Sequence, residues 1–152
     1  MEKLIKKLLL NLKIEIFAVL LIGVIVFVLG ELDVIPNGLV EPGTQMEFNV
    51  NTIFIIYVLL AIPGSLQLFK LNTTRNLRRM DKDEALVAYH LWSAIRLLIL
   101  GLGIWGGVAV YFLCVGSVTG LLCSLACVFI VLYCWPKRDS IDKYLENLNN
   151  DN

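Results

Sequence analysis

Five polar side chains lie close to the ends of long apolar segments, and they are the residues through which this chain could do chemistry. Glu15 and Arg96 each fall a short distance inside an apolar run, Gln67 and Tyr133 lie near the ends of two others, and His90 lies just before one. Ionisable groups inside a membrane are costly, so each marks a candidate functional position. With the membrane topology that the basic residues indicate, we expect the five to form one polar cluster at a single depth in the bilayer. Such a cluster could bind a proton or a small substrate and couple it to transport.

The same residues have a structural interpretation, which the sequence favours. Glu15 and Arg96 are close enough to an interface for their side chains to reach the headgroups. An ion pair between them would instead lower the cost of burial and fix one helix against another. Polar residues also hold helices together without transporting anything. Both interpretations stay open at this point.

Other kinds of site find little support. His90 is the sole histidine, and a zinc site needs further ligands of its kind. Cys123, Cys127 and Cys134 share one helical face and Cys114 lies apart, but cysteine is also an ordinary small apolar residue. The chain contains no paired nucleophile and base, phosphate loop or nucleotide motif. The sequence therefore predicts no enzyme activity, no cofactor and no metal.

Composition places these residues in a membrane protein. The chain has 152 residues, of which 58% are hydrophobic and 17% charged, with a mean hydropathy of +0.77. Soluble domains are about 45–50% apolar and about 25% charged, so the excess indicates contact with lipid. The few basic residues form no long exposed stripe, which argues against a nucleic-acid partner.

Four apolar segments approach the about 20 helical residues that cross a bilayer core of about 30 Å. They cover residues 14–30, 50–69, 91–115 and 118–135. Backbone polar groups cannot remain unpaired in lipid, so each segment must be a helix. The predicted fold is all-α: a single domain over residues 1–152 that forms an integral membrane four-helix bundle with four transmembrane helices.

The basic residues set the orientation. Twelve of the 13 Lys and Arg residues lie before the first span, between the second and third, or after the fourth, and only Arg96 lies within a span. The positive-inside rule makes that side cytoplasmic. We therefore expect a multi-pass protein of the cell membrane, most in keeping with a bacterial inner membrane, with both termini in the cytoplasm.

The segments outside the spans carry their own patterns. Residues 31–49 form an acidic outer loop with two turn-forming stretches, and we expect a small hairpin there. Asp81 and Glu84 have capping-box spacing, so the third helix is predicted to begin near Lys82, in the cytoplasm. Residues 139–149 are predicted to form a short cytoplasmic amphipathic helix. Its apolar face needs a partner, and the N-terminal segment and the base of the third helix are the nearest candidates.

Small residues predict how the spans pack. Gly103 and Gly107 form a close-packing motif that lets another helix approach, either the fourth span or a second copy of the chain. The short turn after the third span favours the fourth span as the partner. Pro63 is expected to kink or open the second helix.

Two function classes follow. The leading hypothesis is a non-enzymatic membrane component that assembles with itself or with another membrane protein. The alternative is a small-solute or ion transporter or channel that uses the polar cluster. Neither hypothesis names a specific partner or solute.

Overall fold

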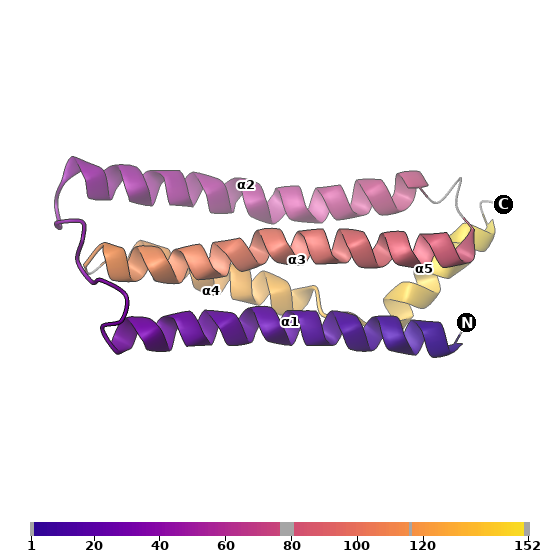
Figure 1. Cartoon of the computed structure of the whole chain (residues 1–152). Helices are drawn as coiled ribbons and strands as arrows, with labels where there is room; N and C mark the ends of the chain where they lie inside the picture. The colour runs from indigo at the N-terminus through magenta and orange to yellow at the C-terminus, as the bar shows by residue number, and fades with distance from the viewer. Residues whose placement is uncertain (1, 77–80, 116, 151–152) are drawn as a thin grey trace.

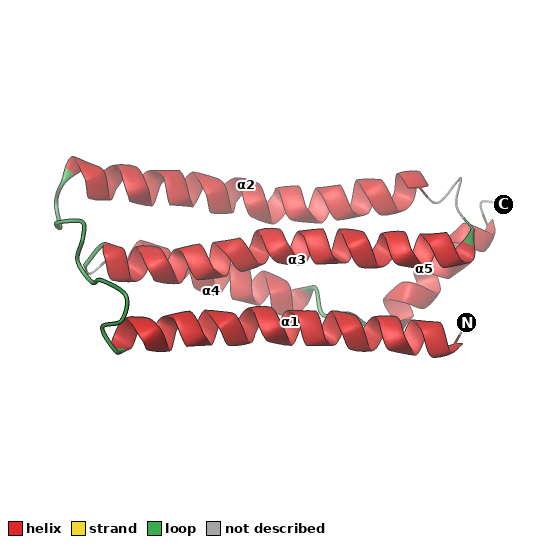
Figure 2. Ribbon diagram, in the orientation of Figure 1, coloured by secondary structure: helices red, strands yellow, loops and turns green. Residues whose placement is uncertain are grey.

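The computed structural model describes residues 2–76, 81–115 and 117–150. In these ranges the chain forms five helices: α1 (Glu2–Glu31), α2 (Gln45–Asn76), α3 (Lys82–Leu113), α4 (Val118–Tyr133) and α5 (Arg138–Asn150). Figure 2 shows these helices joined by loops, with no strand in the described part of the chain. The predicted all-helical fold is confirmed.

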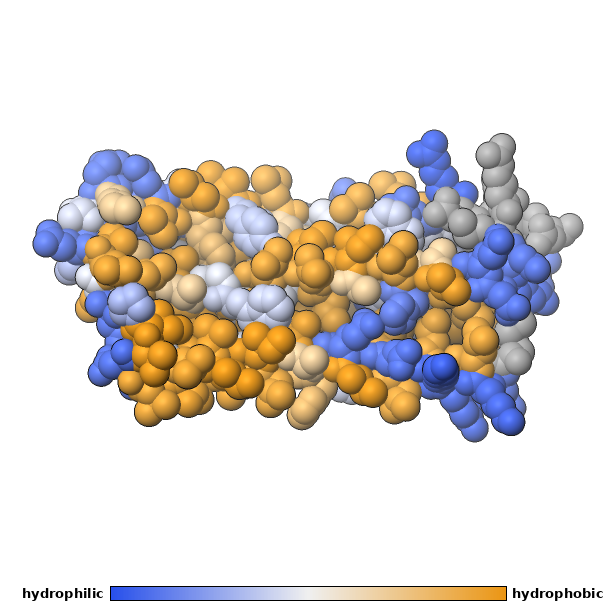
Figure 3. Space-filling view, in the orientation of Figure 1, coloured by the Kyte–Doolittle hydropathy of each residue, from blue (hydrophilic) through white to orange (hydrophobic). Residues whose placement is uncertain are grey.

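Three helices, α1, α2 and α3, are long and apolar enough to cross a membrane. The fourth candidate is shorter, because α4 has 16 residues and extends about 24 Å at 1.5 Å per residue. It reaches the length of a span only when joined to α5, from which it is bent by 62°. In Figure 3 a broad hydrophobic band covers the middle of the molecule, and hydrophilic residues gather at both ends.

Three helices extend beyond their predicted spans at the end of the molecule where the chain begins, and α2 does so by continuing to Asn76. α1 is continuous from Glu2, so the N-terminal basic segment prolongs the first span instead of forming a separate helix. α3 begins at Lys82 as predicted, with Asp81 as its N-cap. The Asp81 carboxylate accepts from the backbone N–H of Lys82, at 2.9 Å, and not from that of Glu84 as in a capping box.

The helices are arranged around α3 (Figure 1). α3 packs against α1, α2 and α4, whereas α1 packs on α3 and touches α5 near the N-terminus. The most apolar 18-residue stretch of α3 is 44% buried, against 17% for the corresponding stretches of α1 and α2. α3 is therefore the central helix of the bundle.

Glycines on different sides of α3 allow this arrangement. A Cβ atom at Gly101 would meet Val19 of α1, and one at Gly106 would meet Phe54 of α2. At Gly107 it would lie 2.6 Å from the backbone oxygen of Gly120 in α4. The predicted motif thus packs against the fourth helix of the same chain. The glycines beside it, Gly101 and Gly106, face two further helices, α1 and α2.

The acidic loop does not form the expected hairpin. Its backbone runs along the end of α3, where the N–H groups of Gly38 and Val40 donate to the carbonyl oxygens of Phe112 and Leu113, both at 3.1 Å. The last carbonyls of a helix have no partner within the helix. The loop therefore donates its backbone hydrogen bonds to the last carbonyls of α3. In a hairpin those donors would have bonded to the opposite strand of the loop.

Pro63 lies inside α2 without ending it, because the helix is continuous from Gln45 to Asn76. Of the two effects expected of Pro63, an opening of the helix is therefore wrong, and a kink stays a prediction. Proline removes one helical hydrogen bond but is tolerated in membrane helices, where neighbouring groups make up for the loss. The bond that Pro63 removes is the one to the carbonyl oxygen of Leu59, four residues earlier, whereas Ser65 Oγ donates to that of Ile62, at 2.9 Å.

A hydrophobic cluster joins the N-terminal turns of α1 to α5, and we call it the terminal platform. In it the apolar face of α5 packs against the first turns of α1 and the first turns of α3. These are the two partners that the sequence suggested for the α5 face. Its buried residues are Ile5, Leu8, Leu12, Ala85, Leu86, Tyr89, Ile141, Tyr144 and Leu148.

Replacing Gly107 by Ala tests the central packing. The new methyl group would press on the Gly120 backbone, which cannot move without shifting α4. We expect a loss of about 1–3 kcal/mol in the free energy of unfolding, measured by denaturant titration in detergent micelles. Gly64→Ala is the matched control, because nothing lies within 4 Å of a Cβ atom at that position. Equal losses in both variants would contradict the role assigned to Gly107.

Candidate functional site

Glu15 and His90 are the two predicted site residues that the structure brings together. Glu15 Oε1 lies 3.0 Å from His90 Nε2, and their side chains are 35% and 33% exposed. The ring nitrogen is not aligned for a hydrogen bond, so the contact is a close approach of two ionisable groups. Glu15 Oε2 is buried and has no hydrogen-bond partner.

Arg96 occupies a different place. Its guanidinium lies over the ring of Phe69 of α2, 4.3 Å from the ring centre, in the geometry of a cation–π contact. The same side chain borders a cavity of about 10 Å³ that Ser93 and Cys134 also line. The sequence suggested an ion pair between Arg96 and Glu15. In the structure Glu15 contacts His90 instead, and Arg96 contacts Phe69.

The remaining two predicted residues point outward. Gln67 is exposed on α2, and Tyr133 is 85% exposed at the end of α4. The five residues therefore do not form one cluster. What the structure assembles is a pair between α1 and α3, with a separate cation–aromatic contact between α3 and α2.

A shallow groove beside the Glu15–His90 pair was not predicted from the sequence. It has a volume of about 220 Å³ and lies between α1 and α3, lined by Leu4, Lys7, Leu8, Asn11, Val87 and His90. In Figure 3 hydrophilic residues reach into the hydrophobic band from the end that holds the N-terminus, along the boundary of α1 and α3. The sequence contains a signal for it, because Lys7, Asn11 and Glu15 recur every four residues and so share one side of a helix.

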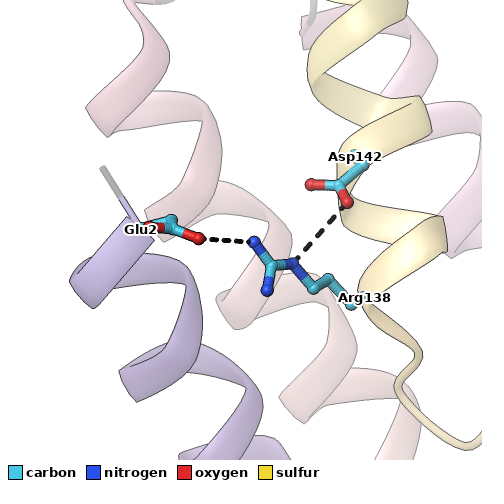
Figure 4. A network of polar contacts seen from close by, with 3 residues as sticks. All are labelled: Glu2, Arg138 and Asp142. Carbon is cyan, nitrogen blue, oxygen red and sulfur yellow. Dashed lines mark hydrogen bonds and ion pairs between the residues drawn. The ribbon is translucent and has the colours of Figure 1, made fainter.

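Polar contacts also hold the terminal platform together. Arg138 at the start of α5 donates to the carboxylate of Glu2, at 2.9 Å, and lies 3.8 Å from Asp142 (Figure 4). Inside the platform the Tyr144 hydroxyl donates to the carbonyl oxygen of Ala85, at 3.5 Å. Burial raises the pKa of the Tyr144 phenol, and the neighbouring Tyr89 raises it further. The hydroxyl therefore keeps its proton at neutral pH.

The described residues offer no place for a metal ion, since no three His, Cys, Asp or Glu side chains among them gather closely enough to hold one. All four cysteines are free, and Cys114 and Cys127 are buried. Cys127 packs against Gly103, where a small apolar side chain fits the close approach of α3 and α4. The cysteines are thus packing residues in this structure.

Comparisons with known protein families, with curated proteins and with solved structures find no match for this chain. The helices alone therefore indicate the class of protein. Three to four of them are apolar enough to cross a membrane, which is consistent with a multi-pass membrane protein.

A double-mutant cycle tests the Glu15–His90 pair. We expect Glu15→Gln and His90→Gln to be coupled by about 0.5–1 kcal/mol in the free energy of unfolding, because the pair is partly exposed and screening limits its strength. Denaturant titration of both single variants and the double variant in detergent gives this value. The cycle of Glu15→Gln with Arg96→Gln is the control and should show no coupling. Coupling in the control cycle alone would mean that Glu15 pairs with Arg96.

Proposed function

We propose that this protein is a non-enzymatic integral membrane component that crosses the bilayer four times and assembles with itself or with another membrane protein. Its two termini, the end of α2 and the terminal platform lie in the cytoplasm, and the acidic loop lies outside. Twelve of its 13 basic residues would then lie on the cytoplasmic side, as the positive-inside rule requires.

The terminal platform is the observation that carries the proposal. It joins three helices into one packed unit beyond the apolar band, and holding four helices in a bilayer does not require such a unit. Its outer surface on α5 is polar, with Lys143, Glu146 and Asn147 exposed. A rigid, charged surface next to the membrane is suited to binding another protein.

The packing of the spans also supports an assembly role over transport. The cluster between α1, α2, α3 and α4 is built from apolar side chains, including Ile16, Val58, Leu100, Ile104 and Val131. The cavity beside Arg96, of about 10 Å³, has room for about one water molecule. A solute path through the described interior would need the helices to separate.

The alternative is a small-solute or ion transporter, and the Glu15–His90 contact is what favours it. A carboxylate and an imidazole 3.0 Å apart could exchange a proton once the ring turns into line for a hydrogen bond. In this alternative the groove between α1 and α3 would be the entry for the solute. It would need a second conformation in which the pair faces the bundle interior.

Cysteine labelling tests the topology. We expect a membrane-impermeant maleimide applied to intact cells to label Glu41→Cys, in the acidic loop, and not Arg75→Cys, at the end of α2. Both positions are exposed, so the difference would report the side of the membrane. The unsubstituted chain measures the background from its own cysteines. Labelling of Arg75→Cys before the cells are opened would reverse the orientation.

Reconstitution separates the two functions. For an assembly component we expect no ion or proton flux in proteoliposomes above that of empty vesicles. The protein in mild detergent should have a defined mass, either as an oligomer or with a stoichiometric partner. Exchange of exposed α5 side chains, as in Lys143→Glu with Glu146→Lys, should weaken that complex without unfolding the chain. Flux that is lost in Glu15→Gln, together with a monomeric mass, would establish the transporter instead.

A further inference from the structure

We propose that the groove between the first turns of α1 and the base of α3 is a binding site for the headgroup of one anionic phospholipid. The site needs only that this end of the bundle lies at the membrane surface. It does not depend on whether the protein assembles with a partner or moves a solute.

The lining of the groove fits a phosphate with a lipid attached. Lys7 and Asn11 from α1 and His90 from α3 border it, and all three side chains can donate hydrogen bonds to phosphate oxygens. The rest of the lining is apolar, from Leu4, Leu8 and Val87. A free phosphate ion gains nothing from apolar walls, whereas the glycerol and the upper acyl chains of a lipid bury apolar surface against them.

The depth of the groove is that of the headgroups. Lys7 and Asn11 precede the predicted start of the first span, residue 14, by about 10 Å and about 5 Å at 1.5 Å per residue. His90 immediately precedes the third span. The polar layer on each side of a bilayer is about 5–8 Å thick, and the lysine side chain can bend toward it. The three donors therefore border the layer in which lipid phosphates lie.

The surrounding charge favours an anion over a neutral headgroup. Lys3, Lys6 and Lys13 are exposed on the same stretch of α1 and attract anionic lipids to this surface. Two carboxylates lie near the groove: Glu15, with Oε1 3.0 Å from His90 Nε2, and the exposed Asp83, one turn before Val87 on α3. The four lysines of this stretch outnumber these two carboxylates.

The matched pair Lys7→Gln and Lys6→Gln tests the site. Both variants remove one positive charge from the same turn of α1, but Lys6 is rotated by about 100° from Lys7 and does not line the groove. Native mass spectrometry of the full chain in detergent, titrated with phosphatidylglycerol, gives the lipid-bound fraction. We expect one tightly held lipid per chain, with affinity reduced about tenfold in Lys7→Gln and less than about twofold in Lys6→Gln.

Three results would overturn the proposal. Equal losses in the two variants would mean that the lipid responds to the overall charge of α1. Equal binding of phosphatidylcholine would mean that the groove does not recognise an anionic headgroup. Inorganic phosphate that displaces phosphatidylglycerol at millimolar concentration would make the groove a site for the free ion. A circular dichroism melt of each variant shows whether the chain is still folded, and His90→Leu, which removes the ring donor, is a second lining variant in which a loss of affinity is also expected.

Discussion

The contact between the backbones of α3 and α4 at Gly107 and Gly120 is the constraint on which the rest of the bundle depends. A Cβ atom at either position would lie 2.6 Å from the backbone oxygen of the other glycine, so the two helices meet with no side chain between them. In a membrane the hydrophobic effect does not bring helices together, and close packing takes its place. With α4 seated this closely, α3 has two sides left for α1 and α2, and Gly101 and Gly106 admit them.

Two further bonds lock the outer helices onto α3. The Trp105 indole donates to the carbonyl oxygen of Val19 in α1, at 3.1 Å, and the Tyr57 hydroxyl of α2 donates to that of Ile99, at 2.9 Å. Each bond joins a side chain to a backbone oxygen of the neighbouring helix. Together with the glycines they fix the rotation of α1 and α2 about their own axes, which determines the partners of Glu15 and Arg96.

The sequence predicted the helices better than the contacts between them. The start of α3 at Lys82, predicted from the spacing of Asp81 and Glu84, matches the structure, in which Asp81 is the N-cap. The site depended on rotation. Arg96 follows His90 by six residues, or about 240° around the helix, so the two cannot both face α1. Hydropathy indicates only the depth of a residue along the bundle. It therefore could not show whether His90 or Arg96 is the partner of Glu15.

The hairpin expected in the acidic loop was wrong for a related reason. The turn residues were read correctly, since Gly38 and Gly43 both have positive φ. The backbone N–H groups between such turns, however, could bond either to each other's strand or to the unpaired carbonyls at the end of α3, and they bond to the carbonyls. A local pattern shows that a segment bends, but not which distant groups its backbone will satisfy.

The packing of α5 on α1 in the terminal platform has a consequence for biosynthesis. α1 precedes α5 in the chain, yet its opening turns are covered by α5, which is held there by the Arg138–Glu2 ion pair. Before α5 is synthesised, Ile5 and Leu8 can contact only the α3 residues of this cluster. A chain cut short before α5 would leave part of that apolar surface open to the quality-control proteases of the cell. The platform thereby makes the stability of the first turns of α1 depend on synthesis of α5.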